Sequence, residues 1–213
     1  MTYGEMKSEV SRRLAEVSGR VFWSEADIAT AIDAGYAEMS DQSEWNEEYF
    51  QVSLLNDRPY YDLRTVVGAN VLSLRAAFDE QTNRWLIPTS VRQFDAHDRR
   101  WERVTGEPQR VFTRGLWWLG YWPRIQADSG LIKQYYTALP APMTDDDDEP
   151  GFPEPFHYGC VNFALTDLWA QDAETDRALL EWAAYLKVEA GLERWVAERA
   201  GSAALHGFAG ASA

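Results

Sequence analysis

The sequence predicts an α+β protein: an antiparallel bundle of about four helices, two N-terminal and two C-terminal, with an inserted antiparallel β-sandwich or small barrel. The first observation is periodicity, because apolar residues recur at helical spacing near both ends and at strand spacing in the middle. The second is charge, which is −7 over residues 1–50, +3 over 51–140 and −10 over 141–213. The third is length, because 213 residues suffice for one large domain or a compact core with one insertion.

Two helices are expected in residues 1–48, the N-terminal part of the bundle. Thr2 and Glu5 have the spacing of a capping box, and apolar residues follow at helical intervals to about Ser18. Ser24 and Asp27 repeat that spacing. A second helix is therefore predicted from residue 25 to the early 40s, with a stripe of Ile28, Ala31, Ile32, Gly35, Tyr36 and Met39.

Residues 49–140 are expected to form the β-rich insert. Short apolar runs are separated there by turn-forming residues such as Asn56, Asp57 and Gly115, and Ser90 with Gln93 predicts one helical interruption. Such short strands and tight turns favour a sandwich or small barrel. Seven strands are predicted, at residues 50–55, 60–63, 71–78, 84–88, 109–113, 116–122 and 131–137.

The C-terminal part is expected to return to helices. Residues 141–155 combine an acidic run with prolines and are predicted to be a linker. Helices are predicted over 156–171 and from 175 to about Ala200, within the C-terminal bundle segment 156–200. Residues 201–213 are small and rich in Gly, Ala and Ser, which predicts a flexible tail.

Composition excludes several classes of protein. The net charge of −14 and pI of about 4.6 argue against a nucleic-acid coat, because phosphate neutralisation needs basic surface. Cys160 is the only cysteine, so neither an intrachain disulfide nor a cysteine-based zinc cage can form within one chain. Apolar runs are short, so neither a membrane span nor a signal peptide is expected.

Two groups of residues have the composition of a metal or catalytic site, and each also has a simpler structural interpretation. The run 145–148 suggests calcium, but an EF-hand loop starting at Asp145 would place Pro150 at the glycine position and Phe156 at the glutamate position. An acidic linker is therefore preferred. His157 and Cys160 lie three residues apart, yet a buried cysteine beside a helix start explains them without chemistry. With no catalytic or nucleotide-binding motif present, we expect no enzymatic activity, no metal and no cofactor.

The candidate interface lies in the insert, where arginine and tryptophan residues gather. The basic group can meet nucleic acid, or the acidic surface of another copy of the chain, and the second is preferred because the chain is acidic overall. The strand predicted at 116–122 is rich in aromatic residues, which can form a sugar-binding platform. Alternatively, one row of its side chains fills the core and the other is exposed and contacts protein. The candidate interface residues are Arg99, Arg100, Arg103, Arg114, Trp117, Trp118 and Trp122.

The order of motifs resembles the head-to-tail adaptor (connector) proteins of tailed bacteriophages, including the tail tubular protein A type. The likeness covers most of residues 1–200 and depends on order and spacing. Its elements are the helix at 2–14, Trp23-Ser24-Glu25-Ala26-Asp27-Ile28, Gly106-Glu107-Pro108, Val111-Phe112, Leu119-Gly120-Tyr121-Trp122-Pro123, Gly130-Leu131-Ile132, Tyr135-Tyr136, Leu139-Pro140, the acidic stretch 143–149 and Pro153-Glu154-Pro155-Phe156-His157.

The resemblance implies a structural ring, commonly of twelve copies, at the head–tail junction of a virion. Its partners would be other copies of itself, the portal protein and a downstream tail or nozzle protein, with DNA passing through the lumen without sequence-specific binding and no membrane involved. Leu205, His206 and Phe208 in the tail are candidate portal-docking residues. The competing hypothesis is a binding module that uses the aromatic and arginine-rich insert on carbohydrate or nucleic acid.

Overall fold

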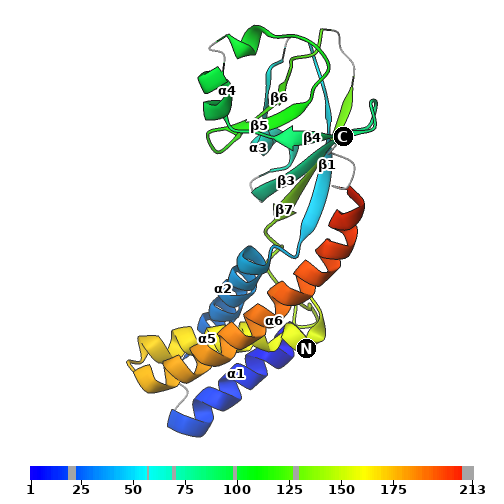
Figure 1. Cartoon of the computed structure of the whole chain (residues 1–213). Coiled ribbons are helices and arrows are strands. Elements are labelled where there is room, and N and C mark those ends of the chain that lie inside the picture. The colour runs from blue at the N-terminus through cyan, green and yellow to red at the C-terminus, as the bar shows by residue number, and fades with distance from the viewer. Residues whose placement is uncertain (19–22, 57, 69–70, 98–99, 127–129, 208–213) are drawn as a thin grey trace. The chain divides into compact units, whose positions relative to one another are not determined.

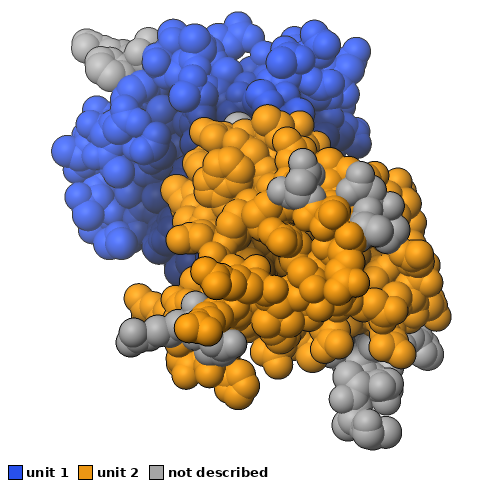
Figure 2. All heavy atoms as spheres, turned by 90° about the horizontal axis from the view of Figure 1, so that it is seen from above, with its two compact units in different colours: residues 1–46, 139–213 blue, residues 47–138 orange. Residues whose placement is uncertain are grey.

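The computed structural model describes residues 1–18, 23–56, 58–68, 71–97, 100–126 and 130–207 (Figure 1). The chain divides into two compact units (Figure 2). The helical unit comprises residues 1–46 and 139–213, and the β insert comprises residues 47–138. The predicted α+β class is confirmed, because helices from both ends of the chain pack together and the sheet is inserted between them in the sequence.

The helical unit is built around helix α5, which packs on α1, α2 and α6. Residues on several sides of α5 are buried, among them Cys160, Ala164 and Leu165, all at 0% exposure. A helix that is buried in this way lies at the centre of a core. The bounds of the helices are α1, Tyr3–Ser18; α2, Glu25–Ser43; η2, Glu154–Phe156; α5, Tyr158–Gln171; and α6, Thr175–Gly207.

Local capping and one glycine position helix α2. Both halves of the predicted capping box are present, since the Ser24 side chain accepts from the Asp27 amide and the Asp27 carboxylate accepts from the Ser24 amide. Further along, Gly35 faces α5. A β-carbon there would lie 2.9 Å from the Phe163 side chain and 3.1 Å from the Cys160 carbonyl oxygen, so glycine permits the close approach of the two helices.

Helix α6 is longer than the sequence predicts. The sequence places its end near Ala200 and assigns 201–213 to a flexible tail, whereas the helix continues to Gly207. Alanine and leucine in this segment have high helix propensity, and a helix already formed upstream avoids the cost of nucleation. The correction concerns residues 201–207, because residues 208–213 lie outside the described part of the chain.

The β insert is one curled sheet, a half-barrel, with strand order β1-β7-β3-β4-β5-β6-β2. Neighbouring strands are antiparallel except for β4 and β5, which are parallel. All seven predicted strands are confirmed, with ends that differ by up to three residues. Their bounds are β1, Glu47–Ser53; β2, Tyr60–Asp62; β3, Val71–Asp79; β4, Arg84–Pro88; β5, Arg110–Arg114; β6, Trp118–Trp122; and β7, Leu131–Ala138.

The insert has two hydrophobic clusters. The larger one is formed mainly by strand residues and includes Leu119, Ile132 and Ala77, all at 0% exposure. The smaller one is aromatic and brings together α4, Val91–His97, the 3₁₀ turn η1, Trp101–Arg103, and strands β5 and β6. The sequence analysis predicts α4 and misses the one-turn helix α3, Leu63–Val66, whose N-cap is Asp62.

Candidate functional site

Among the described residues, the predicted arginine and tryptophan residues lie on β5, at η1 and in and beside β6. Arg114, at the end of β5, donates to the Tyr60 hydroxyl (3.0 Å) and to Glu102 Oε1 (3.1 Å), and Tyr60 donates to the same Glu102 oxygen (2.6 Å). The hydrogen bond with Tyr60 raises the pKa of Arg114, and burial, aided by Glu102, raises the pKa of Tyr60. The charge of Arg114 is thus partly balanced within the insert.

Behind this group lies the aromatic cluster that fixes α4 and η1 to the sheet. Phe94 stacks on Trp101 with ring centroids 4.6 Å apart, and Phe112 meets Trp101 edge to face at 5.1 Å. Trp122 Nε1 donates to the Trp101 carbonyl oxygen (2.9 Å), and Trp101 Nε1 donates to Asp95 (2.9 Å). Trp122 therefore has a structural role, since its indole nitrogen and one ring face are already engaged.

The structure separates the predicted interface residues into more than one surface. Arg103 and Trp122 line one small hollow beside Tyr60. Trp117 lines a different hollow, and the guanidinium of Arg64 lies over its ring at 5.7 Å. The remaining members are Arg100 and Arg114, both exposed, Trp118, 44% exposed, and Arg99, which lies outside the described residues.

A second aromatic group, on the outer face of the sheet, is missing from the sequence analysis. We call it the aromatic ladder, and it comprises Tyr49, Tyr135, Phe78 and Trp85, one from each of β1, β7, β3 and β4. Successive ring centroids lie 6.1 Å (Tyr49 to Tyr135), 5.6 Å (Tyr135 to Trp85) and 5.1 Å (Trp85 to Phe78) apart. Lys133 lies over the Tyr49 ring at 3.8 Å.

The aromatic ladder is exposed enough to be a contact surface. Tyr49 is 57% exposed and Trp85 is 46% exposed, and Ile87, two residues after Trp85 on the same strand, is 59% exposed. Contiguous exposed apolar side chains of this kind mark interaction surfaces. The period-two alternation of β4 already places Trp85 and Ile87 on one face, but β7 becomes the neighbour of β1 and β3 only through non-local pairing.

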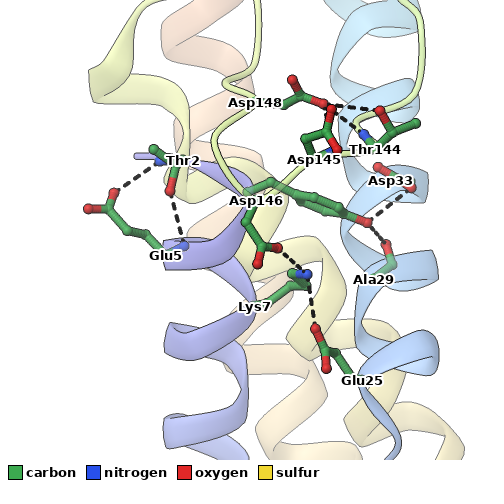
Figure 3. Close-up of polar contacts among 11 residues, drawn as sticks. Thr2, Glu5, Lys7, Glu25, Ala29, Asp33, Thr144, Asp145, Asp146 and Asp148 are labelled. Atoms are coloured by element: carbon green, nitrogen blue, oxygen red, sulfur yellow. Dashed lines mark hydrogen bonds and ion pairs between the residues drawn. The ribbon is translucent and has the colours of Figure 1, made fainter.

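The acidic run 145–148 forms a turn that closes the N-terminus of α1 (Figure 3). The amides of Tyr3 and Gly4 donate to the carbonyl oxygens of Asp148 (2.7 Å) and Asp146 (2.9 Å). Thr2 and Glu5 complete the predicted capping box (Figure 3). The first amides of α1 are therefore all satisfied, which removes the usual cost of a helix end.

Carboxylates of the same region join α1, α2 and the turn. Lys7 lies 2.5 Å from Asp146 and 3.0 Å from Glu25, and these hydrogen bonds raise the pKa of Lys7 (Figure 3). The Asp148 carboxylate accepts from the amides of Thr144 (2.8 Å) and Asp145 (2.9 Å), which lowers its pKa. The region predicted to be a linker is thus packed into the helical unit, with Met143 and Phe152 buried. Among the described residues, no group of His, Cys, Asp and Glu is arranged to hold a metal ion.

His157 and Cys160 are not arranged as a base and nucleophile. The two ring nitrogens of His157 face the carbonyl oxygens of Met1 (3.0 Å) and Phe152 (2.8 Å). Cys160 is fully buried, and burial raises its pKa well above the ordinary value, so the thiol stays protonated. Both residues serve packing in the helical unit.

A family model described as SU10 adaptor protein matches residues 1–206, which span both units. The chain belongs to the SU10 adaptor protein family. The resemblance to phage adaptors is therefore confirmed, and the family gives the adaptor a structural role that involves binding other virion components. Comparison with curated proteins finds none that matches the adaptor.

The remaining candidate residues of the adaptor lie at its C-terminal end. Leu205 and His206 belong to the last turns of α6, and Phe208 lies outside the described residues. Within the described part of the adaptor, no helix has the length and apolar character needed to cross a membrane.

Proposed function

We propose that the chain is the head-to-tail adaptor of a tailed phage. Copies form a ring, a dodecamer, which docks beneath the portal, holds the downstream tail or nozzle protein and continues the DNA channel. The observation that carries this proposal is the family match over residues 1–206. The motif order further supports the narrower tail tubular protein A type. The adaptor would act at the head–tail junction of the virion after assembly in the host cytoplasm.

The charges of the two units support a ring. The helical unit has 8 basic and 23 acidic residues, net −15, whereas the insert has 12 basic and 11 acidic residues, net +1. Different surfaces of one chain can meet head to tail, and such heterologous contacts close into a ring when the rotation allows. Acidic side chains facing the lumen would repel DNA, so that DNA slides through the ring without being held.

The described surfaces offer distinct contacts for the proposed partners. The aromatic ladder, and the exposed residues Arg100, Arg103, Arg114 and Trp118, lie in the insert. The end of α6, with Leu205 and His206, and the following Phe208 are the proposed portal-docking segment.

Imaging the chain with the portal protein of the same phage tests the proposal. We expect negative-stain images of the mixture to show a ring of adaptor copies attached to one end of the portal. A Trp85→Ser variant should weaken assembly if the aromatic ladder is a contact, whereas Leu116→Ser, at an 83% exposed apolar residue between β5 and β6 that belongs to neither proposed contact, is the matched control. Absence of any adaptor density on the portal would contradict the proposal.

The competing function, a carbohydrate- or nucleic-acid-binding module, is less favoured by the geometry. Arg114 is paired with Glu102, and Trp122 is engaged by Trp101, so neither is fully available to a ligand. Titrating the full chain with glycans, and with duplex DNA at two salt concentrations, tests it through tryptophan fluorescence. Tight, saturable binding to either would favour this alternative.

A further inference from the structure

Helix α6 has an apolar side that faces away from its own core. Leu179, Ala183, Leu186 and Ala190 are all exposed, the two leucines at 60% and 42%, and they follow at intervals of four, three and four residues. That spacing aligns them along one side of the helix. We call this row the outer seam of α6.

The opposite side of α6 is the one buried in the helical unit. Tyr185 and Leu192 on that side are at 0% exposure, and Leu180, beside the outer seam, is 72% exposed. A single exposed leucine is ordinary, but a row of apolar residues at helix-packing intervals indicates a contact with another helix. The outer seam therefore lacks a partner within the described chain.

Helix α2 presents a surface of the opposite shape. Ala26, Thr30, Ala34 and Ala37 are exposed and lie along one side of α2, at intervals of four, four and three residues. Ile28, Ile32 and Met39 face the core from the other side. Small side chains allow a second helix to approach closely, because the distance between packed helices depends on the side chains at the contact. We call this row the small-residue face of α2.

The charges beside the two surfaces are complementary. Helix α2 contains no lysine or arginine and five acidic residues, Glu25, Asp27, Asp33, Glu38 and Asp41. Lys187 and Arg194 border the outer seam of α6 and are exposed, and neither forms an ion pair with another described residue. Exposed Glu193 continues the outer seam and exposed Glu198 follows Arg194 by four residues, so the charge on α6 is mixed. Lys187 and Arg194 are the cations beside the outer seam that can meet the acidic edge of α2 at Glu38 and Asp41.

We propose that the outer seam of α6 in one copy packs on the small-residue face of α2 in the next copy. The inference rests on the proposed ring, and it names the helices that join neighbouring copies. Both surfaces belong to the helical unit, and they differ from each other. The contact is therefore heterologous and repeats from copy to copy, as a ring requires, where a two-fold dimer would use one surface twice.

Cysteine cross-linking in the full chain tests the contact. The native Cys160 is fully buried, so engineered cysteines are the reactive ones. An A34C/L186C double variant, assembled with the portal and treated with a short bismaleimide, is expected to give a ladder of covalently linked multimers on a denaturing gel. The A34C and L186C single variants should give no ladder. An S11C/L186C variant, with its other cysteine exposed on α1, is the matched control and should also remain uncross-linked.

The outcomes separate this inference from the proposed ring. A ring seen by native mass spectrometry without cross-linking of A34C/L186C would overturn the α6–α2 contact and leave the ring intact. Dimers formed by L186C alone would overturn it in favour of an α6–α6 contact. A chain that stays monomeric with the portal present would overturn both the ring and the contact.

A charge exchange gives a second measurement that does not depend on cross-linker geometry. A K187E/R194E variant is expected to weaken assembly by roughly tenfold, because exposed ion pairs are each worth up to about 1 kcal/mol. Adding E38K/D41K to the same chain should restore assembly. If the fourfold variant assembles no better than the twofold variant, these two edges do not face each other.

Discussion

The helical unit and the β insert bury apolar surface in different ways. The helical core is largely aliphatic and is assembled from both ends of the chain, with Val10 of α1 and Leu165 of α5 in one cluster. The insert is continuous in sequence and holds 15 of the 29 aromatic residues in residues 47–138. Its smaller cluster consists of stacked and edge-to-face rings around Phe94, Trp101 and Phe112.

The two units also present different surfaces. The helical unit carries net −15, whereas the insert is close to neutral and exposes aromatic residues. Aromatic side chains supply large contact areas at interfaces, and rows of apolar side chains on packed helices set how one helix is aligned along the other.

The largest effect is expected in the helical core. Leu165→Ala removes a side chain with 0% exposure from the centre of α5 and should lower the free energy of unfolding of the helical unit by about 2–5 kcal/mol. Urea denaturation followed by far-UV circular dichroism measures it. The matched control is Leu180→Ala, 72% exposed on α6, which should change the value by about 0.5 kcal/mol or less. Equal effects would contradict the central position of α5.

A smaller effect is expected in the insert, where Gly120 lies against the ring of its cross-strand neighbour Phe112. A β-carbon at Gly120 would overlap that ring, so Gly120→Ala should cost about 1–3 kcal/mol of stability. Gly106→Ala is the matched control, because its β-carbon would meet only Pro123, at 3.6 Å or more. Near-UV circular dichroism reports the aromatic packing. Unchanged stability of Gly120→Ala would show that Phe112 moves aside freely.

The hydrogen bonds of the acidic turn 145–148, which lies at the N-terminus of α1, should make the stability of the helical unit depend on pH in the acidic range. Hydrogen bonds from the amides of Asp145 and Thr144 lower the pKa of Asp148, so its stabilising contribution is present above the ordinary pKa of an aspartate. It is lost as the pH falls through the lowered pKa of the folded state. Asp148→Ala should therefore reduce thermal stability at neutral pH and have little effect in acid, whereas Asp147→Ala should be neutral at both. Equal loss at both pH values would contradict this linkage.

The smallest effect is expected at alkaline pH in the insert. Burial and a hydrogen bond to Glu48 (2.7 Å) raise the pKa of Tyr136 to about 12. The folded state thus retains this proton, and the stabilisation is present below pH 10, the ordinary tyrosine pKa, and is lost as the pH rises toward 12. Tyr136→Phe should remove one group from the late part of the tyrosinate absorbance titration, and Glu48→Gln should shift that group to lower pH. Burial also raises the pKa of Tyr3, Tyr121 and Tyr185, so the difference between each variant and the unmodified chain identifies Tyr136. A titration unchanged in both variants would contradict the assignment.

Patterns among residues close in the sequence predicted most helices and strands. The features that were not predicted depend on contacts between segments far apart in the chain. The capping boxes at Thr2 and Ser24 act over three residues, so the starts of α1 and α2 follow from sequence. The parallel β4–β5 pair and the aromatic ladder arise only when distant strands adjoin, and no spacing within one strand reveals this. Similarly, the acidic run received a linker interpretation because its contacts with Tyr3 and Lys7 cross more than 130 residues.

Native mass spectrometry of the full chain, alone and mixed with the portal of the same phage, shows whether this protein joins the portal as an adaptor. We expect a species whose mass equals a portal assembly plus a fixed number of adaptor chains, namely twelve. A chain that remains monomeric in both samples and adds no mass to the portal would contradict the adaptor function proposed for this protein.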